Sequence, residues 1–145
     1  MAAVVSLMIL LTVQEWTESQ AGVTAKFSDG SVGLLSRSSR DYAFSVGILT
    51  TSGKAPIVVE WGAKGEVLSA SRARRDLVKW MTEIPEGGWR LIMTKMNGTP
   101  KLLPQTPEFS RIRSVVNDSI AEKREVWLAI KLPEFIIVDA QLVER

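Results

Sequence analysis

The sequence contains neither cysteine nor histidine among its 145 residues. Without cysteine there is no disulfide and no thiolate, so cysteine usage gives no reading of the redox compartment. Without histidine the chain lacks the usual general base, the commonest metal ligand and a side chain that titrates near neutral pH. Both absences argue against zinc, iron and copper sites and exclude Ser–His and Cys–His nucleophiles. We therefore expect no metal, no cofactor and no enzymatic activity.

Motifs of nucleotide-binding and hydrolytic sites are also missing. The sequence has no GxGxxG, Walker lysine, GxSxG or EF-hand pattern. Residues 62–65 match the bare GxxG of a KH loop, but they stand between two predicted strands, which indicates a hairpin turn. Glu15 and Glu18 are three residues apart, and on a strand they lie on opposite faces. A catalytic carboxylate pair is therefore not expected there.

Composition and charge are those of a folded globular protein. Hydrophobic residues make up 46% and charged residues 23% of the chain. The net charge of +2 is nearly balanced but unevenly spread: residues 36–82 carry eight basic and four acidic side chains, whereas residues 1–35 carry one and three. The length suits one ordinary domain, and we predict a single domain over residues 1–145.

The first fourteen residues carry no charge and are strongly apolar. A transmembrane helix needs about 20 apolar residues, so this run is too short. A secretory signal peptide begins with basic residues, which are missing, although residues 19–21 resemble a cleavage site. The third interpretation is a buried strand, because β-branched residues lead into Glu15–Glu18. We favour the strand.

Short segments of alternating polarity, separated by turn residues, predict further strands at the spacing of a sandwich or barrel. Asp29-Gly30 and Asn97-Gly98 are strong hairpin signals, because glycine accepts a positive φ. The polar segment 36–41 predicts a loop. The predicted strands are 23–27, 32–36, 42–50, 57–61, 66–68, 89–94, 101–104, 126–132 and 135–143.

Two segments predict helices. In residues 69–85 apolar side chains recur at helical spacing, and Pro85 with the following glycines ends the pattern. The second helix is predicted to begin at Thr106-Pro107-Glu108, with an acid in its first turn. The predicted fold class is α+β, mostly antiparallel β (sandwich or barrel-like), with two amphipathic helices packed on the sheet.

The functional prediction is a non-enzymatic structural subunit. Apolar segments near both ends of the chain suggest long strand edges, which isolated monomers usually blunt or cover. The most concrete form is a virion component of a phage, such as a capsid decoration or tail protein, that forms homo-oligomers and docks on a larger partner without a membrane. Its location is then the virion, or the cytoplasm if the protein is not viral. The predicted interface residues are Val5, Leu7, Ile9, Leu11, Arg37, Arg40, Phe135 and Ile137.

The alternative is a small, barrel-like module that binds nucleic acid through the basic middle of the chain. Its predicted contacts are Arg72, Arg74, Arg75 and Lys79. Five tryptophans offer surfaces for base stacking. Against this alternative, the net charge is small, and an amphipathic helix exposes its charged face to solvent without any ligand.

Overall fold

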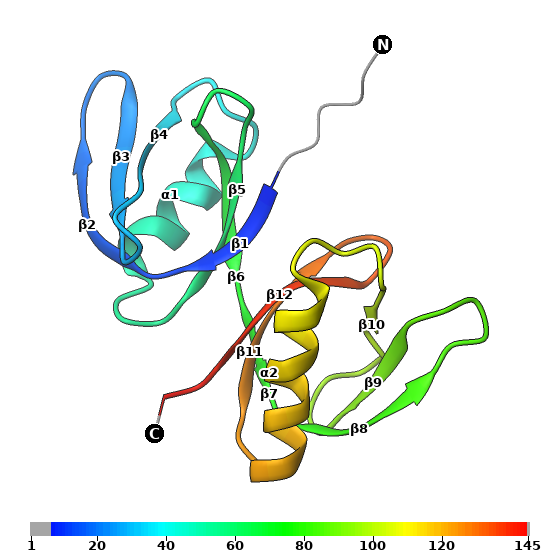
Figure 1. Ribbon diagram of the computed structural model, residues 1–145. Helices are drawn as coiled ribbons and strands as arrows, with labels where there is room; N and C mark the ends of the chain where they lie inside the picture. Colours follow the sequence, from blue (N-terminus) through cyan, green and yellow to red (C-terminus); the bar gives the residue numbers. More distant parts are fainter. Residues whose placement is uncertain (1–6, 145) are drawn as a thin grey trace. The chain divides into compact units, whose positions relative to one another are not determined.

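The computed structural model describes residues 7–144. Contacts divide the chain into two compact units, Met1–Arg72 (unit 1) and Ala73–Arg145 (unit 2), each with its own hydrophobic core. We describe each unit by itself (Figure 1). The single domain over residues 1–145 stays a prediction, because a division of contacts does not measure whether the two units unfold together.

The predicted fold class is confirmed: both units are mostly antiparallel β, and each contains one helix. The elements of unit 1 are β1 (Leu7–Leu11), β2 (Val13–Glu18), β3 (Gly22–Phe27), β4 (Val32–Ser36), α1 (Tyr42–Thr51), β5 (Ile57–Trp61) and β6 (Val67–Arg72). Those of unit 2 are β7 (Arg74–Asp76), β8 (Val78–Glu83), β9 (Trp89–Met93), β10 (Lys101–Leu102), α2 (Phe109–Glu122), β11 (Val126–Lys131) and β12 (Ile136–Leu142).

Unit 1 is built on one strand that bends from one sheet into another. Its three-stranded sheets have the orders β1-β5-β6 and β2-β3-β4. Only Thr12 separates β1 from β2, and Figure 1 shows the two as one curved ribbon. The Ser28 N–H donates to the Thr12 carbonyl at 2.8 Å, which fixes the bend. Large buried side chains such as Phe27 and Leu35 fill the space between the sheets and α1.

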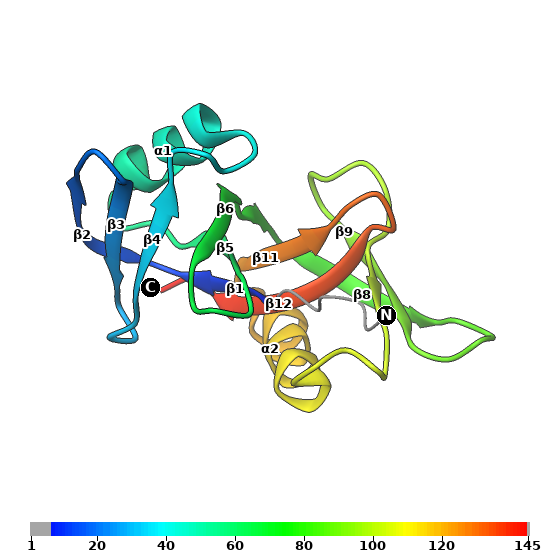
Figure 2. The same cartoon turned by 90° about the horizontal axis from the view of Figure 1, so that it is seen from above.

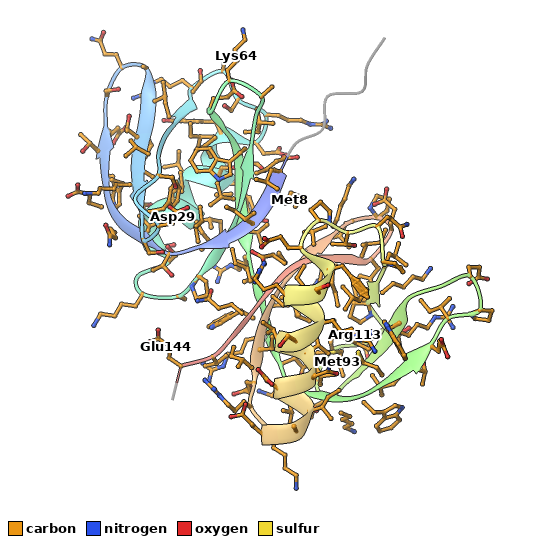
Figure 3. All side chains as sticks on the ribbon, in the orientation of Figure 1. Met8, Asp29, Lys64, Met93, Arg113 and Glu144 are labelled. Carbon is orange, nitrogen blue, oxygen red and sulfur yellow. The ribbon has the colours of Figure 1, made fainter. Side chains whose placement is uncertain are left out.

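Unit 2 also has a bent first strand, and there the two halves of that strand belong to one sheet. The six-stranded sheet has the order β7-β11-β12-β10-β9-β8, so β7 and β8 form its two edges. Only Leu77 separates these two strands in the chain. A sheet whose opposite edges are halves of one bent strand must curl into a barrel. Helix α2 packs on β8, β11 and β12 (Figure 2), and the buried Met93 belongs to the core that α2 covers (Figure 3).

The bend of unit 2 is held by a buried carboxylate. Asp76 is only 1% exposed. Its oxygens accept the backbone N–H groups of Leu77 at 2.7 Å, Lys95 at 3.0 Å and Met96 at 2.8 Å. Because an ionised carboxylate only accepts hydrogen bonds, three backbone donors suit it well. Asp76 thereby joins the bend to the start of the β9–β10 loop.

The two units repeat one arrangement. Both contain four strands, a helix and two strands, and in both the first strand bends after a few residues. Each has a bulge just past the bend, between Val13 and Glu15 in unit 1 and between Val78 and Trp80 in unit 2. The bulged strands also resemble each other in sequence, VQEWTE against VKWMTE. A residue of one unit can therefore be matched to its counterpart in the other.

Two predicted elements are wrong. Residues 69–85 do not form a helix: Val78 and Asp76, which a helix would expose, are buried, whereas Trp80 on the predicted apolar stripe is 52% exposed. Cross-strand pairing overrides the local helical pattern there. Residues 42–50 do not form a strand, because α1 occupies them and buries Ser45, Ile48 and Leu49 at helical spacing.

The other predicted elements agree with the structure. The hairpin around Asp29-Gly30 and the strands at 57–61, 89–93 and 126–131 are present, and α2 begins at Phe109, shortly after its predicted start. Glu108 precedes the helix as its N-cap residue, so the predicted acid in the first turn is wrong. A strand is confirmed over Leu7–Leu11 and again over β2, but the predicted burial is found only at Leu10 and Leu11, and β2 is largely exposed. The rest of that predicted segment, residues 1–6, lies outside the described residues.

Candidate functional site

The outward side of β8, β9 and β10 presents an exposed aromatic residue and two cations. Along β9 the buried Leu91 and Met93 face the core, so Arg90 and Ile92 point outward. Cross-strand pairs share a face of the sheet. Arg90 pairs with Lys101, and Ile92 pairs with Trp80. We call this surface, defined by Trp80, Thr82, Arg90, Ile92 and Lys101, the β8–β10 face.

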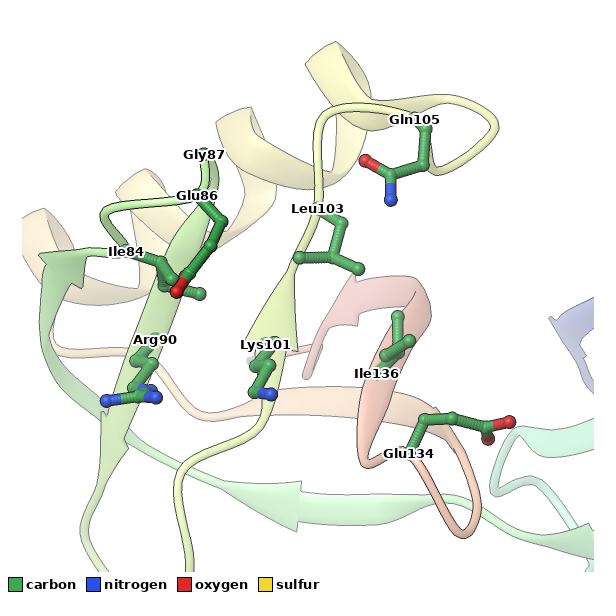
Figure 4. A pocket seen from close by; sticks show the side chains of 9 residues that line it. All are labelled: Ile84, Glu86, Gly87, Arg90, Lys101, Leu103, Gln105, Glu134 and Ile136. Atoms are coloured by element: carbon green, nitrogen blue, oxygen red, sulfur yellow. The ribbon is translucent and has the colours of Figure 1, made fainter.

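A groove of about 600 Å³ opens over part of this face (Figure 4). Arg90 and Lys101 stand side by side on neighbouring strands. The walls come from the β8–β9 turn, the segment after β10, and the β11–β12 loop. The lining residues are Ile84, Glu86, Gly87, Arg90, Lys101, Leu103, Gln105, Glu134 and Ile136.

The cations of the groove form no direct ion pair among the described residues. Over residues 7–144, neither Arg90 nor Lys101 makes an ion pair within 4.0 Å. By contrast, Arg111 pairs with Asp139 and Glu108, and Arg37 with Glu18. Two adjacent cations without a carboxylate partner offer donors to an anionic ligand.

The corresponding face of unit 1 lacks the two cations and the tryptophan of the β8–β10 face. The registers match Trp80 with Glu15, Arg90 with Thr24, and Lys101 with Leu34. Unit 1 contains six basic and six acidic residues and unit 2 twelve and ten, so the net charge of +2 belongs to unit 2. The same backbone arrangement therefore carries a basic face in one unit only.

The predicted nucleic-acid residues do not form one helix face, because that helix is absent. Arg72 ends β6 in unit 1, whereas Arg74, Arg75 and Lys79 lie on β7 and β8 in unit 2, all exposed.

Arg75 is already engaged within unit 2. Its Nη2 lies 3.0 Å from Glu125 Oε1, and its guanidinium lies 5.6 Å from the centre of the Trp127 ring. The hydrogen bonds from Arg75 and then from Lys95 hold the pKa of the Glu125 carboxyl below its ordinary value. The carboxylate thus stays ionised at neutral pH and pairs there with both Arg75 and Lys95.

The predicted interface residues are found in different environments. Leu7 is 49% exposed, but Leu11 at 7% and Ile137 at 0% lie in the two cores, and Ile9 packs against the first. Leu11 and Ile137 therefore stabilise the fold and present no surface to a partner. Phe135 is half-buried in the β11–β12 loop. Val5 lies outside the described residues.

The two predicted interface arginines lie in the turn after β4. Arg37 donates to the carbonyls of Gln20 and Ser19, both at 2.8 Å, and lies over the Tyr42 ring, so it ties the turn to the β2–β3 connection. Arg40 is exposed. An interface role for Leu7, Arg37, Arg40 and Phe135 stays a prediction.

Sequence reasoning did not find Arg90 and Lys101 as a pair. The alternation of residues 89–93 does place Arg90 on the outward side. Lys101 joins it only through the β9–β10 register, and the groove requires residue 136 of β12 as well. Such long-range pairings leave no local pattern in the sequence.

The acidic side chains and the two described helices also bear on function. Among residues 7–144, no group of three or more acidic side chains is placed to hold a metal ion. Neither described helix has the length and apolar character needed to cross a membrane. Comparison of the chain with protein-family models, curated proteins and solved structures finds no match.

Proposed function

We propose that the chain is a non-enzymatic binding protein whose unit 2 holds single-stranded nucleic acid on the β8–β10 face. The observation that carries this proposal is the adjacent pair Arg90 and Lys101, which lines a groove and has no ionic partner among the described residues. Cationic grooves that follow a phosphate backbone are the common element of single-strand binding.

The topology of unit 2 supports the same proposal by analogy. Counting β7 and β8 as one bent strand gives five strands, with a helix between the third and fourth. The third and fifth, β10 and β12, pair in parallel. This is the connectivity of the OB-fold barrel, which binds oligonucleotides on the face of strands 2 and 3 and in the adjoining loops. The groove occupies those positions, although a fold by itself does not define a function.

The exposure of Trp80 favours a single strand over a duplex as the ligand. Its side chain is 52% exposed beside Ile92, on the same face as Arg90. Folded proteins usually bury much of such a large apolar ring. An exposed indole can stack on an unpaired base, whereas the bases of a duplex are already stacked on one another. The face thus combines cations for phosphates with an aromatic surface for bases.

The first test measures binding of labelled single strands and duplexes by fluorescence anisotropy over a range of salt. We expect single strands to bind more tightly than duplex. The affinity should fall as salt rises, because binding releases counterions from the nucleic acid and this release is less favourable at high salt. Trp80→Ala should weaken single-strand binding by about fivefold or more, since stacking contributes about 1–3 kcal/mol per base. The control is Trp16→Ala on β2 of unit 1, also an exposed tryptophan, which should have little effect. Equal losses in both variants would contradict the proposal.

We propose assembly into a larger structure as the second candidate function. The observation that favours it is α1, ten residues without a charge, whose Phe44 is 59% exposed. An added side-chain carbon at Gly47, one turn further on, would meet no atom within 4 Å. An uncharged helix surface with an exposed phenylalanine suits contact with another chain. The virion form of this hypothesis stays a prediction.

Phe44→Lys tests the assembly candidate. We expect the wild-type chain to elute as an oligomer in light scattering, and the variant to be folded and monomeric, because a buried lysine opposes association. Lys64→Ala, at the turn after β5 where Lys64 extends away from the strands (Figure 3), serves as the control and should leave the mass unchanged. A monomeric wild-type chain would contradict self-association.

A further inference from the structure

We propose that the groove selects bases that carry an exocyclic amino group, with Glu86 and Glu134 as the acceptors that recognise it. This inference rests on the proposed single-strand binding, and it names which strands the site prefers. It starts from the charges that line the groove. Besides Arg90 and Lys101, the groove contains two carboxylates, which a site for phosphate alone would not favour.

The carboxylates form no direct ion pair with the cations of the groove. Among the described residues, neither Glu86 nor Glu134 forms an ion pair within 4.0 Å. An ionised carboxylate accepts hydrogen bonds and donates none. A ligand that fits all four charged groups must therefore present an anion to the cations and hydrogen-bond donors to the carboxylates.

The placement of these groups separates the two roles. Arg90 and Lys101 lie on the sheet, whereas Glu86 belongs to the β8–β9 turn and Glu134 to the β11–β12 loop. Figure 4 shows Glu86 extending from its turn toward the strand that carries Arg90. When phosphates bind at the sheet, the edges of the bases lie near side chains of the loops.

The remaining walls suit the flat faces of a base. Ile84, Leu103 and Ile136 line the groove and come from three separate segments of unit 2. Aliphatic side chains pack against base rings without regard to base identity. Discrimination must then come from polar groups at the base edge, and the carboxylates are the charged acceptors present.

Cytosine, adenine and thymine differ at that edge. Cytosine presents a 4-amino donor, a group that glutamate and aspartate accept from in protein–nucleic acid contacts, and adenine presents a 6-amino donor. Thymine and uracil carry a carbonyl oxygen where cytosine carries its amino group. A carboxylate repels that oxygen. We therefore expect cytosine-containing strands to bind more tightly than thymine-containing strands.

The experiment compares oligo(dC) with oligo(dT) of about 12 nucleotides, within the site sizes known for single barrels of this kind. Wild-type protein should bind oligo(dC) about fivefold or more tightly, since one good base contact contributes about 1–3 kcal/mol. Glu86→Gln and Glu134→Gln keep the size of each side chain and remove its charge. Each variant should bind oligo(dT) more tightly than wild type does and lower the preference for oligo(dC). Glu66→Gln, in the β5–β6 turn of unit 1, is the control and should change neither affinity.

The outcomes separate this inference from the proposed function. Equal affinities for the two oligonucleotides, both weakened by replacing Arg90, would overturn base selection and leave single-strand binding intact. A preference for oligo(dC) that persists in both glutamine variants would also overturn it. No binding of either oligonucleotide at low salt would reject the proposed function and this inference with it.

Discussion

Replacement of both Arg90 and Lys101 by alanine is expected to lower the affinity for a single strand by about a hundredfold or more at low salt. Each side chain can make a hydrogen bond to phosphate that is assisted by its charge, and such bonds contribute about 1.5–3 kcal/mol. The slope of log affinity against log salt should also become shallower by about 1.4, since each phosphate contact to a single strand contributes about 0.7. Anisotropy titrations at several salt concentrations measure both quantities.

The matched control is Lys26→Ala. Lys26 is exposed on the unit 1 surface that corresponds to the β8–β10 face, where its counterpart is Ile92. Lys26→Ala removes one positive charge outside the groove. The affinity should therefore change by less than about twofold, as expected for a distant charge screened by salt. Comparable losses from Lys26→Ala and from either single replacement in unit 2 would mean that binding follows net charge and not the groove.

Replacement of Asp76 by alanine is expected to lower the free energy of unfolding by about 3–5 kcal/mol. The change removes a buried acceptor and leaves the N–H groups of Leu77, Lys95 and Met96 without their partner. Those donors lie where the bend and the β9–β10 loop meet, and their hydrogen bonds to Asp76 are partly buried. Urea denaturation followed by circular dichroism measures the loss, provided that the transition is cooperative.

Asp29→Ala serves as the control for that experiment. Asp29 also accepts a backbone N–H, from Ser31 at 2.9 Å, but it stands in an exposed turn. Water can replace its hydrogen bonds, so the loss should be about 1 kcal/mol or less. A similar small effect at Asp76 would show that the bend of unit 2 is held by other contacts.

Local signals in the sequence were sufficient for the hairpin around Asp29-Gly30. Asp29-Gly30 lies between strands that pair with each other, and Gly30 has the positive φ of 87° that the turn requires. The alternation of residues 89–93 likewise gave β9 and its buried side. In both cases the interacting residues are close in the chain, so the pattern and the pairing coincide.

Where the interacting residues are distant in the chain, the local pattern predicted the wrong element. Residues 42–50 alternate like a strand, yet their buried side chains also fit helical spacing. In the helix, Ser45 Oγ accepts a hydrogen bond of 3.2 Å from the backbone N–H of Ala70, a distant residue of the chain. Residues 74–76 lie within a segment of helical spacing, yet they pair with residues 126–128 of β11. The number of helices was predicted correctly only because one segment was wrongly taken as a helix and another as a strand.

The candidate site was missed for the same physical reason. The basic residues that are consecutive in the sequence, Arg74 and Arg75, are conspicuous but lie outside the groove, and Arg75 is paired with Glu125. Arg90 and Lys101 are isolated in the sequence and become neighbours through strand pairing. A sheet surface collects its charges from several strands, so runs of charge along the chain do not reveal it.

The bent first strand of each barrel also determines when that barrel can close during synthesis. β1 pairs with β5, so every strand of unit 1 finds its partner once residue 72 has been made. β7 pairs with β11, so the start of unit 2 stays without its partner until residues 126–128 leave the ribosome. N-terminal segments generally fold first on a growing chain. Unit 1 can thus be complete before unit 2 is, and β10 with Lys101 pairs with β12 only when the last strand has been made.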